Sequence, residues 1–232
     1  MQLEGRRVIV TGGSRGIGYR ISELFLAEGA QVLAVSRSST KLQGAKEQLP
    51  ALTTLVADVS VPSEIDRVVS WAESEWGAVD ILVNNAGVLD ESEQGLTEGP
   101  DDSFLATMQV NLHGPYYCTK RILPLLLRSS DPRILNVGSS AGILGPELTG
   151  SYGVSKAALH ALTFATANEL KGKVSVNAMD PGWVRTDMSP NGPGDPKWSA
   201  AGALSIVTRS PSVTGKLFYG KRIRAWIPRS TS

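Results

Sequence analysis

The sequence predicts an α/β protein built on a doubly wound parallel sheet, with one domain covering residues 1–232. Short apolar runs alternate with segments of helical periodicity along most of the chain. The runs are continuous rather than alternating with polar residues, as expected of parallel strands that are buried on both faces. A length of 232 residues with 41% hydrophobic side chains suits one large domain around a single core.

The order of the elements supports this fold class. Strands separated by helices favour parallel pairing through right-handed crossovers. Ligands of such sheets bind beyond the carboxyl ends of the strands, so functional residues are expected directly after each apolar run. The predicted strands are Arg7–Val10, Gln31–Ser36, Thr54–Ala57, Asp80–Val83, Arg133–Val137 and Val174–Ala178. The predicted helices are Ile17–Glu28, Thr40–Leu49, Pro62–Trp76, Asp102–Leu127 and Tyr152–Leu170, followed by a short helix near Trp198–Val207 and a closing strand within Gly215–Tyr219.

The composition excludes several classes of function. The formal net charge is +1, which gives no reason to expect nucleic acid or a membrane surface as a partner. No apolar segment approaches the roughly 20 residues that cross a bilayer, and the N-terminus does not resemble a signal peptide. The one cysteine, Cys118, is interpreted as a small core residue, and a reducing, cytoplasmic location is expected. His113 and His160 are isolated, so no metal is expected.

A glycine-rich turn follows the first strand and opens the first helix. Gly12, Gly16 and Gly18 allow a tight turn and the close approach of a diphosphate. The N-terminus of the following helix presents free N–H groups and a positive dipole end to an anion. The spacing is Gly-x-x-x-Gly-x-Gly rather than Gly-x-Gly-x-x-Gly, and a purely structural turn is the alternative. Between a strand and a helix, the turn predicts dinucleotide binding.

The end of the second strand indicates which dinucleotide binds. Ser36 and Arg37 stand there, with no carboxylate to accept hydrogen bonds from the ribose hydroxyls of NAD. Arg37, together with Arg15 of the glycine turn, would pair with a 2′-phosphate. The alternative is that both arginines are solvated surface side chains. The sequence therefore favours NADP(H) as cofactor.

Two further strand ends carry polar residues. Asp58 follows the third strand, where it would accept a hydrogen bond from the adenine amino group. Alternatively it belongs to the start of the next helix, because Ser60 and Pro62 are N-terminal helix signals. Asn84-Asn85-Ala86-Gly87 follows the fourth strand. Its amides can tie adjacent strand ends together, and Gly87 permits close approach of a ligand.

Tyr152 and Lys156 form the predicted proton-transfer pair. Their i,i+4 spacing places both on one face of a helix. A nearby ammonium is expected to lower the phenol pKa from its usual value of about 10 toward working pH. The bare pattern also occurs on solvated helix faces. Ser139 directly follows another predicted strand, where it is expected to meet Tyr152.

These motifs together resemble the short-chain dehydrogenase/reductase family, in its compact, carbonyl-reductase-like branch. The residues that carry the resemblance are Thr11–Gly18, Asn84–Gly87, Asn111, Ser139, Tyr152 with Lys156, and Pro181-Gly182, in the family's order. The resemblance runs from the first strand through Thr186. It implies a Rossmann-type sheet and an NADP-dependent oxidoreductase.

The resemblance also implies roles for individual residues. Tyr152 would act as the acid or base, and Lys156 would lower its pKa and hold the nicotinamide ribose. Ser139 would hydrogen-bond the substrate oxygen. The main-chain carbonyl of Asn111 would hold a water in the proton relay. The cofactor-binding set would be Gly12, Ser14, Arg15, Gly16, Ile17, Gly18, Ser36, Arg37, Asp58, Val59, Asn85, Ala86, Gly87, Tyr152, Lys156, Pro181, Gly182, Val184 and Thr186.

The segment after the last family motif is expected to cover the substrate. Residues 187–212 would form a short lid, in which the stretch Ser189–Pro196 has too many helix breakers to be helical. The side chains that flank the predicted catalytic residues are mostly apolar, with Arg185 as the exception, and predict neutral hydrophobic or aryl ketones and aldehydes as substrates. They are Leu89, Ala141, Leu144, Leu148, Trp183 and Met188.

The function expected from these observations is NADPH-dependent reduction of a small-molecule ketone or aldehyde, reversible as alcohol dehydrogenation. A 3-oxoacyl or sterol dehydrogenase of the same family is the alternative, and a non-catalytic dinucleotide-binding regulator is a third reading. The helices Asp102–Leu127 and Tyr152–Leu170 are apolar on more than one face. Since such helices contact a partner subunit in the family, a homotetramer, or else a dimer, is expected.

Overall fold

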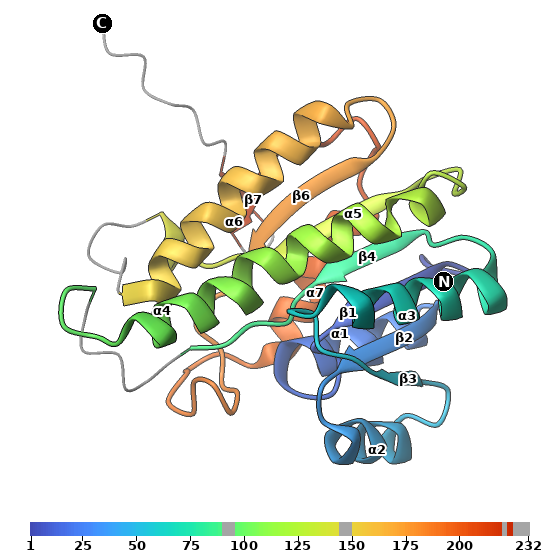
Figure 1. Cartoon of the computed structure of the whole chain (residues 1–232). Helices are drawn as coiled ribbons and strands as arrows, with labels where there is room; N and C mark the ends of the chain where they lie inside the picture. The colour runs from blue at the N-terminus through green and yellow to red at the C-terminus, as the bar shows by residue number, and fades with distance from the viewer. Residues whose placement is uncertain (90–95, 144–149, 220–221, 225–232) are drawn as a thin grey trace, which may run out of the picture.

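The computed structural model describes residues 1–89, 96–143 and 150–219, together with the backbone of residues 222–224. Its strands form one sheet in the order β3-β2-β1-β4-β5-β6-β7-β8 (Figure 1). All neighbouring pairs are parallel except β7 with β8. The order reverses at β1, where the crossovers change direction, and this confirms the predicted doubly wound sheet. The strands are β1 (Arg7–Thr11), β2 (Gln31–Ser36), β3 (Thr53–Val56), β4 (Ile81–Asn84), β5 (Arg133–Val137), β6 (Ser175–Asp180), β7 (Leu217–Tyr219) and β8 (Arg222–Arg224).

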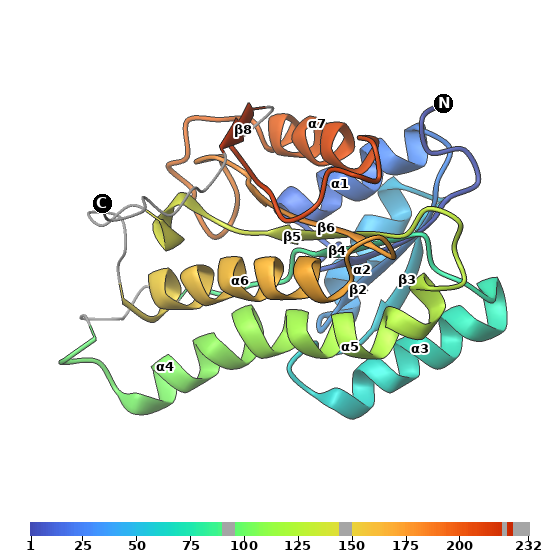
Figure 2. The ribbon, with the colours of Figure 1, turned by 90° about the horizontal axis from the view of Figure 1, so that it is seen from above.

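Helices cover both faces of the sheet, as Figure 2 shows from above. One apolar layer joins α1, α2 and α7 to the sheet, and the other joins α3, α5 and α6 to its opposite face. The central strands are buried from both sides, which explains their continuous apolar sequences. The helices are α1 (Gly16–Ala27), α2 (Ser39–Gln48), α3 (Pro62–Trp76), α4 (Asp101–Met108), α5 (Gly114–Leu126), α6 (Gly150–Glu169) and α7 (Pro196–Val207), with a π-helical turn η1 (Gln109–His113) and a 3-10 turn η2 (Ser140–Gly142).

The long helix predicted over Asp102–Leu127 is interrupted by the π-helical turn. The N–H of Gly114 donates to the carbonyl of Gln109, five residues earlier, so the chain carries one extra residue in this turn. The helical ladder continues into α5 with Pro115 in its first turn. The interruption explains the poor helical periodicity of this stretch and lies at Asn111, a predicted site residue.

Helix α7 occupies much of the segment predicted as a lid. Its Ala203, Ile206 and Val207 are buried in the same apolar layer as α1. Residues 187–195 form turns without a helix, as the breaker-rich sequence predicted. Only this shorter part remains available to cover a substrate, and its role as a lid stays a prediction.

At the amino end of the sheet, Asp80 connects β1 to β4. Its carboxylate accepts hydrogen bonds from Arg7 Nε (2.7 Å) and Arg7 Nη2 (3.0 Å) and from the Ser129 hydroxyl (2.5 Å). Burial alone would raise the pKa of Asp80, but these hydrogen bonds together outweigh burial and hold the pKa at about 2. The ionised carboxylate therefore stabilises the edge of the sheet opposite the glycine turn.

We expect Asp80→Asn to lower the free energy of unfolding by about 2 kcal/mol, because Arg7 loses its charged partner in a partly buried setting. The folded-state pKa is below the ordinary value, so the contribution of the carboxylate is complete above about pH 4 and disappears as the pH falls toward 2. Urea unfolding at pH 6 and pH 3 measures both effects. Asp66→Asn is the matched control, since Asp66 forms an exposed pair with Arg121. Equal stability of the two variants would contradict the assignment.

Candidate active site

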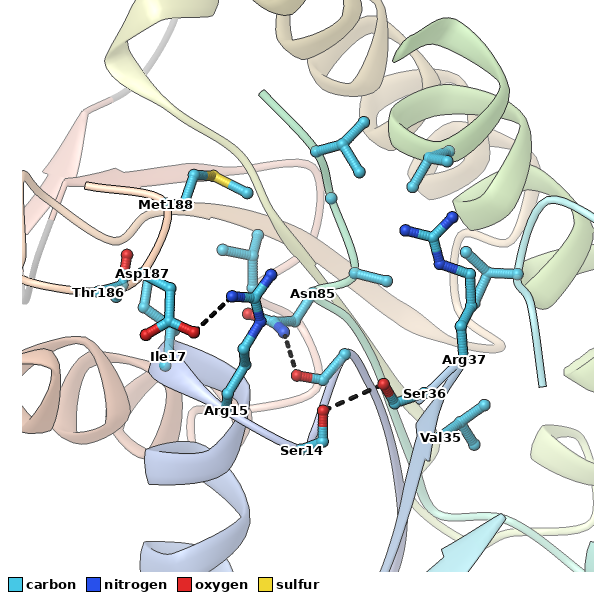
Figure 3. Close-up of a pocket in the computed structure, with 18 of the residues that line it drawn as sticks. Ser14, Arg15, Ile17, Val35, Ser36, Arg37, Asn85, Thr186, Asp187 and Met188 are labelled. Atoms are coloured by element: carbon cyan, nitrogen blue, oxygen red, sulfur yellow. Dashed lines mark hydrogen bonds and ion pairs between the residues drawn. The ribbon is translucent and has the colours of Figure 1, made fainter. Parts of the chain in front are cut away.

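A cleft lies at the carboxyl ends of β1, β2, β4 and β5, where the fold class places ligands. It extends from the glycine turn to Tyr152 and Lys156, and Figure 3 shows its glycine-turn end. The predicted site residues that line it are Gly12, Ser14, Arg15, Gly16, Ile17, Ser36, Arg37, Asp58, Val59, Asn85, Ala86, Gly87, Tyr152, Lys156, Pro181 and Thr186.

The glycine turn is packed too tightly for side chains at Gly12, Gly13 and Gly18. Gly12 has a φ of 65°, and a Cβ there would lie 2.9 Å from the Cα of Ala86. A Cβ on Gly18 would lie 2.3 Å from the carbonyl oxygen of Gly12. Gly18 therefore supports the turn from within α1, whereas Gly16 and Ile17 bring the N-terminus of that helix to the cleft. The residues present fit the diphosphate of a dinucleotide.

The asparagines at the end of β4 connect neighbouring strand ends, as predicted. The Asn84 amide donates to Asn136 Oδ1 of β5 (2.8 Å). The Asn85 amide donates to the carbonyl of Thr11 (2.9 Å), and the Thr11 hydroxyl accepts from the Asn85 N–H (3.0 Å). These contacts fix β1, β4 and β5 where their chains leave the sheet.

Both arginines predicted to recognise a 2′-phosphate lie at one end of the cleft. They flank a hydrogen bond between the hydroxyls of Ser14 and Ser36 (3.0 Å; Figure 3). Arg15 also pairs with Asp187, and Arg37 lies 3.6 Å from Asp58. The cations are therefore present at the predicted place, and each has a carboxylate beside it.

Asp58 serves the start of α3, which was the alternative interpretation of this residue. Its Oδ1 accepts hydrogen bonds from the N–H (2.8 Å) and hydroxyl (2.6 Å) of Ser60. The Glu64 carboxylate accepts from the Asp58 N–H (2.6 Å). Since Asp58 also lines the cleft, a contact with adenine remains a prediction.

Tyr152, Ser139 and Lys156 are brought together by the start of α6 and the end of β5. The Ser139 hydroxyl lies close enough to the Tyr152 phenol to lower its pKa by hydrogen bonding. The Lys156 ammonium lies 5.6 Å from the centroid of the Tyr152 ring and donates to the carbonyl of Val137 (2.9 Å). Gly87 lies next to this ammonium, since a Cβ on Gly87 would lie 3.2 Å from Asn111 Oδ1 and 3.7 Å from Lys156 Nζ.

The sequence predicted that Lys156 lowers the pKa of Tyr152. This prediction is wrong, because the surrounding protein groups raise that pKa. Burial raises the pKa of the Tyr152 phenol, the hydrogen bond with Ser139 lowers it in part, and the charge of Asp180 raises it. Burial also lowers the pKa of Lys156 to about 8, against an opposing effect of Asp180. Desolvation disfavours both charged forms and outweighs the attraction expected from the sequence.

Asn111 is buried beneath the cleft in the π-helical turn. Its Oδ1 accepts from the N–H of Val88 (2.8 Å), and its amide donates to the Val88 carbonyl (2.9 Å) and the Ser155 hydroxyl (3.0 Å). The side chain thus connects the loop after β4 to α6. Since all these contacts use the side-chain amide, the proton-relay role of the main-chain carbonyl stays a prediction.

The loop after β6 approaches the glycine turn. Pro181 and Thr186 line the cleft, and a Cβ on Gly16 would lie 3.3 Å from the Thr186 methyl. Gly182 adopts a φ of 77°, and its N–H donates to the Asp180 carboxylate (2.8 Å). Val184 is buried. Gly182 and Val184 therefore shape the loop without lining the cleft.

The substrate side of the cleft is only partly described. Met188 lines the cleft next to Asp187, at the glycine-turn end, while Leu89 is 39% exposed and Trp183 is 67% exposed. Leu144 and Leu148, also predicted as pocket walls, lie outside the described residues.

Several lining residues escaped the sequence analysis. They are apolar or small residues, for which a wall position and a core position have the same sequence pattern. All lie inside strands or just after them except Val110, which lies in the π-helical turn: Val35, Ala57, Val88, Val110, Val137 and Gly138. Asp187 was missed as well. Its signal was an acidic residue directly after Thr186, and only the fold places it beside Arg15.

His160 lies one helical turn beyond Lys156 and is buried against the end of β5. A Cβ on Gly138 would lie 2.2 Å from His160 Nε2, so the glycine makes room for the ring. Burial, and secondarily the charge of Lys156, lower the pKa of His160 to about 4. The imidazole is therefore neutral at physiological pH and adds no charge beside Lys156.

Within the described residues there is no group of three or more side chains suited to hold a metal ion. Nor does any helix in that part of the chain combine the length and apolarity needed to cross a bilayer.

Comparisons with known proteins agree with this fold. The family model for short chain dehydrogenases matches residues 6–195. An uncharacterized oxidoreductase of Staphylococcus saprophyticus is 32% identical, with 86% of each chain covered. The 3-oxoacyl-[acyl-carrier-protein] reductase FabG of Vibrio cholerae is 34% identical over 82% of this chain and 78% of its own. The family model spans both the glycine turn and the Tyr152–Lys156 pair.

Solved structures are similar over nearly the whole chain. The RhlG/NADP active-site complex of Pseudomonas aeruginosa superposes with a TM-score of 0.86 at 32% identity, covering 94% of this chain and 95% of that one. A putative short chain dehydrogenase from Pseudomonas syringae gives a TM-score of 0.88 at 29% identity, with 94% and 96% covered.

We expect His160 to make the folded protein sensitive to acid. Its folded-state pKa of about 4 is below the ordinary 6.5, so the unfolded chain binds the proton more readily between these values. The free energy of unfolding should fall by up to about 3 kcal/mol as the pH drops through this window. His160→Gln should remove this part of the pH dependence in urea unfolding, whereas His113→Gln, at an exposed histidine, should keep it. A wild-type profile in His160→Gln would exclude the assignment.

Proposed function

Because the chain belongs to the short-chain dehydrogenase family of oxidoreductases, we propose that it is an NADPH-dependent carbonyl reductase. In the reverse direction it oxidises the corresponding alcohol. The observation that carries this proposal is one cleft that joins the glycine turn and two arginines to Tyr152 and Lys156.

The cofactor site is assigned from the residues that line the cleft. The glycine turn and the N-terminus of α1 would hold the diphosphate, and Arg15 and Arg37 would pair with the 2′-phosphate. Lys156, Pro181 and Thr186 would contact the nicotinamide half. When bound, NADPH supplies the hydride, and the protein supplies position and electrostatics.

Tyr152 would donate the proton to the carbonyl oxygen of the substrate. Since burial raises the pKa of its phenol, Tyr152 is protonated at neutral pH, which is the form required for reduction. The Ser139 hydroxyl, which lies close to the Tyr152 phenol, would donate a hydrogen bond to the same substrate oxygen and stabilise developing negative charge. The Lys156 ammonium would favour the phenolate left after proton transfer. Oxidation starts from the phenolate, so it should be favoured at alkaline pH.

The substrate class is inferred from the side chains beyond the catalytic pair. Met188 lines the cleft, and Leu89 and Trp183 expose apolar surface in the adjoining loops. These residues favour a neutral ketone or aldehyde with a hydrophobic or aryl substituent.

A 3-oxoacyl reductase is the second candidate, because FabG of Vibrio cholerae is 34% identical to the chain. Arg185 could then meet an anionic carrier group. The ratio of kcat/KM for an aryl ketone and for a 3-oxoacyl thioester distinguishes the two candidates. A sterol dehydrogenase requires a third substrate in the same panel. A non-catalytic regulator is disfavoured by the assembled Ser139, Tyr152 and Lys156.

We propose a homotetramer, or else a dimer. Leu105 of α4 is 60% exposed and Tyr116 of α5 is 42% exposed, which supports a partner on this side of the molecule.

We expect turnover of an aryl ketone to be faster with NADPH than with NADH. Arg37→Ala should reduce this preference by about tenfold or more, because a charged hydrogen bond to phosphate is lost. Arg20→Ala, which removes an arginine paired with Glu23 on α1, should leave the preference intact. Steady-state rates with both cofactors measure the effect, and equal wild-type rates would remove the support for Arg37.

We expect Tyr152→Phe to lower kcat by about 10²- to 10⁴-fold, because the proton donor is lost. NADPH affinity should stay near the wild-type value in a fluorescence titration. Tyr116→Phe, at an exposed tyrosine of α5, should retain full turnover. Unchanged turnover in Tyr152→Phe would refute the proton-transfer assignment.

A further inference from the structure

A tight turn carries Asp187 to the cofactor end of the cleft. Thr186 and Ser189 close it, since the N–H of each donates to the carbonyl of the other (3.2 and 3.0 Å). Asp187 and Met188 form its tip, and both line the cleft (Figure 3). The loop after β6 therefore places a carboxylate at the glycine turn.

The Asp187 carboxylate accepts a hydrogen bond from Arg15 Nη1 at 2.5 Å, across 172 positions of sequence. The hydrogen bond from Arg15 is the largest cause that lowers the pKa of Asp187, and the charges of Arg15 and Lys41 act in the same direction. Asp187 is consequently ionised at neutral pH. The same guanidinium is the one assigned to the 2′-phosphate of the cofactor.

We propose that Asp187 is a specificity-determining residue that competes with the 2′-phosphate of NADP(H) for Arg15. The inference rests on the proposed function, because it requires that Arg15 contacts this phosphate. Asp187 lowers the affinity for phosphorylated dinucleotides and leaves the affinity for their unphosphorylated counterparts unchanged.

The 2′-phosphate should bind Arg15 more strongly than the Asp187 carboxylate does. The side chains of Arg15 and Asp187 are 48% and 65% exposed, and exposed ion pairs contribute little to stability. A phosphate carries more charge and more acceptor oxygens than a carboxylate, and it can bind a guanidinium through two hydrogen bonds. The phosphate therefore displaces Asp187, at a small but measurable loss of affinity.

The Arg37–Asp58 pair on the other side of the cleft differs from this arrangement. Its separation is 3.6 Å, and Asp58 is held in place by hydrogen bonds from Ser60. Asp58 therefore stabilises the turn that precedes α3, whereas the Asp187 side chain contacts the glycine turn. Asp187 can therefore be changed without removing hydrogen bonds of the kind that Asp58 makes with Ser60 in the turn before α3.

Competition for Arg15 also couples the two sides of the cleft. The ion pair connects the 186–189 turn to the glycine turn. When the 2′-phosphate binds Arg15, this connection is lost. The coupling is reciprocal: the factor by which the Arg15–Asp187 ion pair lowers the affinity for the 2′-phosphate equals the factor by which the bound phosphate weakens the ion pair. NADH lacks the 2′-phosphate, so the Arg15–Asp187 ion pair remains when NADH binds.

Isothermal titration with 2′,5′-ADP and with 5′-AMP tests the proposal, because the two nucleotides differ only in the 2′-phosphate. Asp187→Asn should bind 2′,5′-ADP about two- to fivefold more tightly than the wild type, as expected for the loss of an exposed ion pair. Its affinity for 5′-AMP should not change. Asp66→Asn is the matched control: it also removes one exposed carboxylate paired with an arginine, but away from the cleft, and should bind both nucleotides like the wild type.

A double-mutant cycle with Arg15→Ala identifies the path of the effect. In the Arg15→Ala background, Asp187→Asn should no longer tighten 2′,5′-ADP, because there is no shared guanidinium. Unchanged or weaker binding of 2′,5′-ADP by Asp187→Asn, or a gain that persists without Arg15, would overturn the proposal. If the wild type binds 2′,5′-ADP no better than 5′-AMP, the NADP assignment itself fails. This outcome differs from one in which the wild type prefers 2′,5′-ADP but Asp187→Asn leaves its affinity unchanged, which would contradict only the role of Asp187.

Discussion

The hydrogen bonds that hold the carboxyl ends of β1, β4 and β5 together are the contacts on which the site depends. At this edge the chains leave the sheet, and the amides of Asn84 and Asn85 and the hydroxyl of Thr11 add side-chain hydrogen bonds to the last rungs of the ladder. Such buried polar contacts are costly to leave unmade. Since the glycine turn follows β1 and Ser139 follows β5, these contacts set the distance between cofactor and catalytic groups.

Burial sets the protonation states beside these strand ends. Tyr152, Lys156 and His160 lie along one stretch of α6, and in each of them desolvation is the largest influence on the pKa and disfavours the charged form. The outcome is a neutral phenol and a neutral imidazole at physiological pH, with a lysine whose pKa is about 8. In the proposed reduction, the neutral phenol would be the proton donor. The small residue Gly138 allows this packing, because the imidazole occupies the space of a side chain there.

At the glycine-turn end of the cleft the charged side chains are exposed, so desolvation has little effect on them. Arg15 and Arg37 each have a carboxylate beside them, so neither cation is isolated at the surface. Exposed pairs exchange partners at little cost. If Arg15 and Arg37 bind a 2′-phosphate as proposed, that phosphate would replace a carboxylate partner that each arginine already has.

The sequence by itself determined the alternation of strands and helices, the glycine turn and the residues at each strand end, because these are properties of short segments. The same local patterns could not separate a cleft wall such as Val137 from a core position, nor foresee the π-helical turn at Asn111. Only the tertiary structure decided the upward shift of the Tyr152 pKa and the pairing of Arg15 with Asp187. Desolvation and ion pairing depend on which distant segments meet, and that is fixed when the loop after β6 folds over the turn after β1.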